Sequence, residues 1–132
     1  MSVEIVIEKA SPRQIIEAKL VYQRDKKVDI MDIDILLDRE DKIRKYSRNS
    51  VFWYFADLYY KEDNPNADEE TIRIAGEIIK EEHQKSINQI NEKFRDDGEM
   101  KSEIFSRIEQ YKWKEENYGN PRKKSKAFIS LY

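Results

Sequence analysis

The run from Val51 to Tyr60 constrains the fold more than any other feature of this sequence. Nine of its ten residues are apolar or aromatic, and only Asp57 is charged. Because successive side chains of an α-helix point about 100° apart, such a run covers every side of a helix with apolar surface. A helix of that kind is stable only when other elements surround it. We therefore expect residues 51–60 to form the centre of a helical core or of an interface with another protein.

Helix-breaking residues are scarce, with three glycines and three prolines in 132 residues. This scarcity predicts long elements with short joints. The segment Ser11-Pro12-Arg13-Gln14 combines an N-cap serine, proline at the first helical position and glutamine at the third, so it predicts a helix start. This helix is expected to end at residues 24–27. The residues expected on its inward face are Ile15, Ile16, Lys19, Leu20 and Gln23.

Residues 28–37 are ambiguous, because their apolar positions recur both with the period of a strand and with that of a helix. We favour a helix from about Met31, with Asp29 as a candidate N-cap. No breaker follows before Asn64-Pro65, so either one long helix or two helices jointed near residues 47–50 fit the sequence. We expect the joint, because the segment Ser-Arg-Asn-Ser at 47–50 offers a natural cap for the aromatic run.

The second half of the chain predicts two further helices. The first is expected to start at Asn66 or Asp68 and to end at Gly98. Its apolar stripe consists of Ile72, Gly76, Ile79, His83, Ile87, Ile90 and Phe94. The second is expected over residues 99–117, with a stop at Gly119-Asn120-Pro121. Its inward residues are Met100, Ile104, Ile108 and Tyr111.

Both ends of the chain differ in character from the helical middle. Val3, Ile5 and Ile7 alternate with polar residues, which predicts a short extended or β segment within residues 1–10. Residues 122–132 form a basic and aromatic tail that is expected to pair with this segment or to dock on another subunit. The fold class we expect is mainly α: a four- to five-helix antiparallel bundle with short extended segments at both ends. Residues 1–121 then make one domain.

The residue inventory excludes several kinds of catalytic site. Without cysteine, there are no disulfides, thiolate metal sites or cysteine nucleophiles. His83 is the only histidine, and position 80, where a di-iron helix would carry glutamate, is Lys80. No glycine-rich phosphate loop occurs. We expect a protein without cofactor, metal or enzymatic activity, and a carboxylate-dependent enzyme is the residual alternative.

The aromatic residues favour a role in protein association, because tryptophan and tyrosine dominate the energetics of interfaces. We therefore expect an interaction or assembly protein that binds a protein partner or copies of itself, a type common among phage and viral accessory proteins. No signal peptide or membrane span is expected, so a cytoplasmic location is the default. The expected interface residues are Phe52, Trp53, Tyr54, Tyr59, Tyr60, Phe128 and Tyr132.

The alternative hypothesis is nucleic-acid binding through two local basic patches, since the formal net charge of −2 gives the whole molecule no attraction for polyanions. Basic residues beside aromatic ones suit phosphate contact combined with base stacking. Tyr46 lies within the first patch, and Trp113, Tyr118 and Phe128 flank the second. The patch residues are Arg39, Lys42, Arg44, Lys45 and Arg48, and then Arg122, Lys123, Lys124 and Lys126.

Overall fold

The computed structural model of the chain describes residues 10–28 and 38–119. These residues are 88% helical, with four α-helices and no strand among them, so the mainly α fold is confirmed. The extended segments expected at both ends, and the helix start near Met31, lie outside the described residues. The elements are α2 (Pro12–Val28), α3 (Arg39–Asp63), α4 (Glu69–Lys93), α5 (Gly98–Lys114) and the π-helix η2 (Glu115–Gly119), which continues α5.

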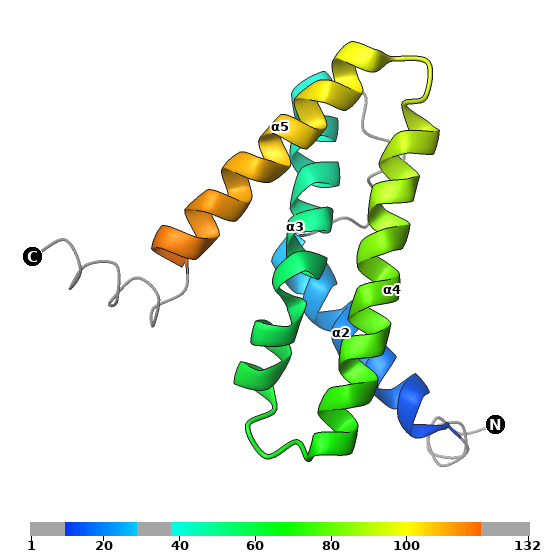
Figure 1. Ribbon diagram of the computed structural model, residues 1–132, viewed down its shortest axis with the longest axis vertical. Helices are drawn as coiled ribbons and strands as arrows, with labels where there is room; N and C mark the ends of the chain where they lie inside the picture. Colours follow the sequence, from blue (N-terminus) through cyan, green and yellow to red (C-terminus); the bar gives the residue numbers. More distant parts are fainter. Residues whose placement is uncertain (1–9, 29–37, 120–132) are drawn as a thin grey trace, which may run out of the picture.

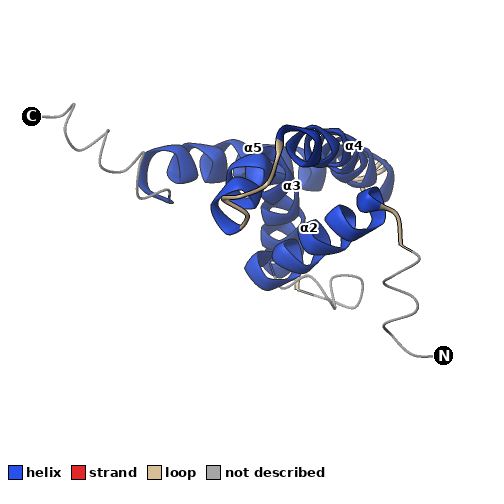
Figure 2. Cartoon of the chain, turned by 90° about the horizontal axis from the view of Figure 1, so that it is seen from below, coloured by secondary structure: helices blue, strands red, loops and turns tan. Residues whose placement is uncertain are grey.

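Helix α3 is the centre of the arrangement (Figure 1). It runs antiparallel to α4, and α2 crosses this pair obliquely and packs on both helices. Helix α5 packs mainly on α3, and its C-terminal end extends away from the other helices (Figure 2). The end of α2 is hydrogen-bonded to Arg48 near the middle of α3, and the start of η2 is hydrogen-bonded to Tyr59 nearer the end of α3.

The start of α2 has the capping box that its sequence predicts. The Ser11 amide donates to Gln14 Oε1 at 2.8 Å, and the Gln14 amide donates to Ser11 Oγ at 3.2 Å. Ile16 and Leu20 are buried as expected, whereas Ile15 is exposed. The helix continues to Val28, one residue beyond the expected exit.

The joint expected at residues 47–50 is wrong, because α3 is one continuous helix from Arg39 to Asp63. Ser47 and Ser50 are fully buried and do not cap a new helix. The Ser47 hydroxyl donates to the Ile43 carbonyl oxygen of its own helix, a bond that a mid-helix serine can form without breaking the helix. Burial on all sides then favours continuity over the local preference of serine for a cap.

An aspartate caps the helix that follows each of the two joints at the ends of α4. Asp68 is the N-cap of α4 and accepts a hydrogen bond from the Thr71 amide at 2.8 Å. The helix ends at Lys93, so the expectation that Gly98 ends it is wrong. Gly98 is the first residue of α5, because Asp97 accepts a hydrogen bond from the Met100 amide and caps that helix.

The buried face of α4 is displaced from the stripe expected for it. Ile79 and Ile90 are buried, but Gly76 is exposed and His83 is half-buried. Because α2 and α3 both pack on α4, its contact face is broader than one stripe. The buried residues of α4 are Ala75, Ile78, Ile79, Ser86 and Ile90.

The core lies around the aromatic residues of α3. Trp53 is only 1% exposed, and its ring meets the ring of Phe52 edge-on with 5.1 Å between centroids. The other helices each contribute fully buried aliphatic residues to the same cluster, including Leu20 from α2, Ile78 from α4 and Ile104 from α5. Of the two alternatives expected for residues 51–60, the centre of a core or of an interface, the structure shows most of the run in the core.

Candidate functional site

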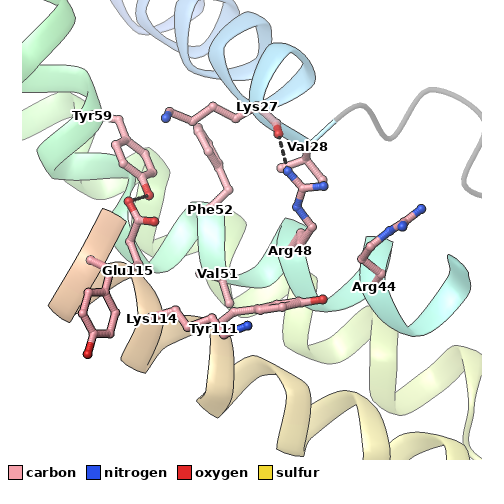
Figure 3. Close-up of a pocket in the computed structure, with 11 residues that line it drawn as sticks. Lys27, Val28, Arg44, Arg48, Val51, Phe52, Tyr59, Tyr111, Lys114 and Glu115 are labelled. Carbon is pink, nitrogen blue, oxygen red and sulfur yellow. Dashed lines mark hydrogen bonds between the residues drawn. The ribbon is translucent and has the colours of Figure 1, made fainter. Parts of the chain in front are cut away.

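An open cleft of about 510 Å³ lies where the end of α2, the middle of α3 and the junction of α5 with η2 meet (Figure 3). Four cationic side chains, one carboxylate and four aromatic rings line it. We call it the basic cleft. Its lining residues are Lys27, Val28, Arg44, Arg48, Val51, Phe52, Tyr59, Tyr111, Lys114, Glu115 and Tyr118.

Basic residues of α3 cap the end of α2 at one edge of the basic cleft. Arg48 Nη2 donates to the Lys27 carbonyl oxygen at 3.0 Å, and Lys45 Nζ donates to the Val28 carbonyl oxygen at 3.1 Å. The last carbonyls of a helix lack partners within the helix, and cations there also complement the helix dipole. These contacts hold Lys27 at the cleft, where its Nζ lies 4.3 Å from the centroid of the Tyr59 ring.

The opposite edge is held by a hydrogen bond between Tyr59 and Glu115. The Tyr59 hydroxyl donates to Glu115 Oε1 at 2.6 Å, which joins the π-helix η2 to α3. Burial raises the pKa of Tyr59, and the bond to Glu115 raises it further, so the phenol stays protonated. The only carboxylate among the lining residues is therefore engaged within the protein.

The remaining polar groups leave an excess of positive charge in the basic cleft. Arg44 forms an exposed ion pair with Asp41 at 2.8 Å. Lys114 and Arg48 form no ion pair in the part of the chain that the structure describes. Arg107 donates to the Tyr111 hydroxyl at 3.3 Å and so steadies the ring that lines the cleft. Even with Asp41 included, cations outnumber carboxylates at this site.

The basic patch expected at residues 39–48 is divided between two surfaces. Arg39 forms an ion pair with Glu103 of α5 at 2.7 Å. Lys42, which belongs to α3 like Arg39, is half-buried. Arg44 and Arg48 line the basic cleft, together with residues of α2 and α5. The second patch, Arg122, Lys123, Lys124 and Lys126, lies outside the described residues.

Most of the aromatic residues expected at an interface belong to the core. Phe52, Trp53, Tyr59 and Tyr60 are buried, and Tyr54 is 44% exposed. Four of the five residues expected at an interface within this run therefore belong to the core of the chain itself. The physical reason is that three helices already surround α3. Phe128 and Tyr132 lie outside the described residues.

Two exposed aromatic residues lie instead at the end of α5. Trp113 is 56% exposed and Tyr118 is 60% exposed, and their rings meet edge-on at 5.5 Å between centroids. Both residues lie beside the tail in the sequence, but no sequence pattern indicates that Tyr118 lines the basic cleft. The spacing of Tyr111, Lys114 and Tyr118 at intervals of three and four is the pattern that could have placed them on one helical face.

His83 lies at the surface of the bundle between three helices. Its ring lies 5.9 Å from that of Tyr54 on α3, and its Nε2 finds no hydrogen-bond partner among the described residues. Burial lowers the pKa of His83, and the nearby Lys112 ammonium lowers it further. Within residues 10–28 and 38–119, no group of three or more acidic or histidine side chains could hold a metal ion.

No protein-family model matches this sequence, and no curated protein or solved structure compared with it matches either. None of the helices in the described part of the chain combines the length and the apolar character that a membrane span needs.

Proposed function

We propose that this chain is a non-enzymatic interaction protein whose bundle of four to five helices binds a protein partner or a second copy of itself. The observation that supports this function most directly is the pair formed by Trp113 and Tyr118, which is more than half exposed at the end of α5. Tryptophan and tyrosine are the residues that contribute most to the stability of protein interfaces.

The position of this pair also supports association. The end of α5 extends away from the rest of the bundle (Figure 1), so a partner can approach it without displacing another helix. Exposed aromatic rings that already contact one another lose little side-chain entropy on binding, because their rotamers are already restricted. Tyr54, with Lys112 Nζ 4.1 Å from its ring centroid, gives α3 a further exposed aromatic residue.

Replacement of both aromatic residues tests the proposal. We expect Trp113→Ala combined with Tyr118→Ala to lower the molar mass found by light scattering, or to remove a partner that co-purifies with the native protein. The helix signal in circular dichroism should not change. Tyr22→Ala is the matched control, because Tyr22 is equally exposed but lies on α2. Unchanged mass and unchanged partners in the double variant would contradict the proposal.

A further inference from the structure

The charge of the basic cleft is assembled from three helices. Lys27 comes from α2, Arg44 and Arg48 from α3, and Lys114 from α5, and all line the same space (Figure 3). The whole chain carries a net charge of −2, so this excess of cations is local. Positive charge collected in a recess focuses the electrostatic field and attracts anions. The charges of the lining therefore fit an anionic ligand.

The aromatic lining narrows the class of anion. Tyr111 is half-buried and Tyr118 is largely exposed, so both offer ring surface to a ligand. A carboxylate-rich peptide needs cations but no flat ring surface. A nucleic acid uses both, because phosphates pair with lysine and arginine while bases stack on aromatic rings. The combination favours a nucleic acid over an acidic peptide.

The exposed ring surface in the basic cleft favours single strands over duplexes. In a duplex the bases are stacked inside and present only their edges in the grooves. Stacking on protein rings therefore requires unpaired bases. We propose that the basic cleft binds single-stranded nucleic acid, with phosphates at Arg44, Arg48 and Lys114 and bases stacked on Tyr111 and Tyr118. This inference shares Tyr118 with the proposed protein association but rests on the cations of the basic cleft, which that proposal does not use.

The ion pair of Arg44 does not oppose this binding. It joins neighbouring turns of one exposed helix surface, and pairs of that kind contribute little to stability. A phosphate can therefore compete with Asp41 for the guanidinium. Arg48 keeps the end of α2 in place through a single nitrogen, which leaves its other nitrogens for a ligand.

Fluorescence anisotropy of labelled oligothymidylate and oligoadenylate with the full chain tests the proposal across a salt series. We expect binding whose logarithm falls linearly with the logarithm of salt concentration, as phosphate contacts require. Arg44→Glu combined with Lys114→Glu should weaken binding at least tenfold and make the salt dependence shallower. Lys61→Glu combined with Lys80→Glu changes the net charge equally at exposed residues outside the basic cleft, and should bind like the native protein.

Stacking is tested separately from charge. Tyr118→Ala should weaken oligonucleotide binding about tenfold but leave the binding of heparin, a polyanion without bases, unchanged. Tyr22→Ala is the control for loss of an exposed ring. All variants retain residues 120–132, so any contribution of the tail is common to them.

Four outcomes would overturn the inference. The first two are no oligonucleotide binding at low salt, and equal affinity for duplex and single-stranded oligonucleotides. The other two are an equal loss of affinity in the cleft variant and the control charge variant, and stronger binding of polyglutamate than of oligonucleotides. The last would assign the basic cleft to an acidic protein segment. Failure of the proposed association remains distinguishable, because Arg44→Glu with Lys114→Glu should leave the molar mass unchanged.

Discussion

At the scale of single residues, two buried serines on α3 are expected to differ in their effect on stability. The Ser47 hydroxyl donates to the Ile43 carbonyl oxygen and lies 3.2 Å from the Ile104 carbonyl oxygen of α5. The Ser50 hydroxyl has no hydrogen-bond partner among the described residues. A satisfied buried hydroxyl stabilises a fold by about 1 kcal/mol, whereas an unsatisfied one costs free energy.

Ser47→Ala should therefore lower the free energy of unfolding by about 1 kcal/mol. Ser50→Ala, the same chemical change three residues further along the helix, should leave that free energy unchanged or raise it. Urea unfolding followed by circular dichroism measures both. Equal destabilisation by the two substitutions would show that the hydroxyl of Ser50 has a partner after all.

At the scale of the elements, η2 depends on its hydrogen bond to α3. Tyr59→Phe removes the hydroxyl that binds Glu115 and should cost about 1 kcal/mol of stability. Because this bond joins the π-helix to α3, the amides of residues 115–119 should also exchange hydrogen faster. Tyr60→Phe is the matched control, since the Tyr60 hydroxyl donates no hydrogen bond to any described residue. Exchange that stays as slow in Tyr59→Phe as in the control would contradict this role.

The sequence predicts the helices well where the local and the tertiary preferences agree. The capping box at Ser11 is correct because its two hydrogen bonds are local, and the inward face of α5 is correct because its buried residues follow one helical stripe. The joint at residues 47–50 is wrong because local capping and burial compete there. Burial depends on the approach of α5 to Ser47, which no local pattern reveals.

The basic cleft could be predicted only in part. The cluster of basic residues around Arg44 and Arg48 is visible in the sequence, and both line the cleft. Lys27 and Lys114 come from helices far apart in the chain, so their approach to the same space follows from how α2 and α5 pack on α3. A pattern within one helix contains no information about that packing.

At the scale of the whole molecule, we expect His83 to make the stability of the fold depend on pH. It lies on α4 beside Tyr54 of α3, and Lys112 of α5 lowers its pKa in addition to burial. Asp57 and Lys80 line the same surface hollow. An imidazole in this position is favoured in its neutral form, because its charged form would lose hydration and be repelled by the Lys112 ammonium.

The sign of the resulting pH dependence follows from linkage. The pKa of His83 in the folded molecule lies below its ordinary value of 6.5, so the unfolded chain binds more protons as the pH falls through that value. Stability should therefore fall between pH 6.5 and the lowered pKa of the folded state. His83→Asn should remove this part of the pH dependence, because asparagine does not titrate.

Urea unfolding from about pH 7.5 to about pH 5 compares the native protein with this variant. The carboxylates titrate in both proteins, so the difference between the two curves isolates His83. Lys112→Met is a second variant, because it removes the neighbouring charge and should raise the pKa of His83 toward 6.5 in an NMR titration. Parallel stability curves, together with an unshifted His83 titration, would show that protonation of His83 does not change the free energy of unfolding.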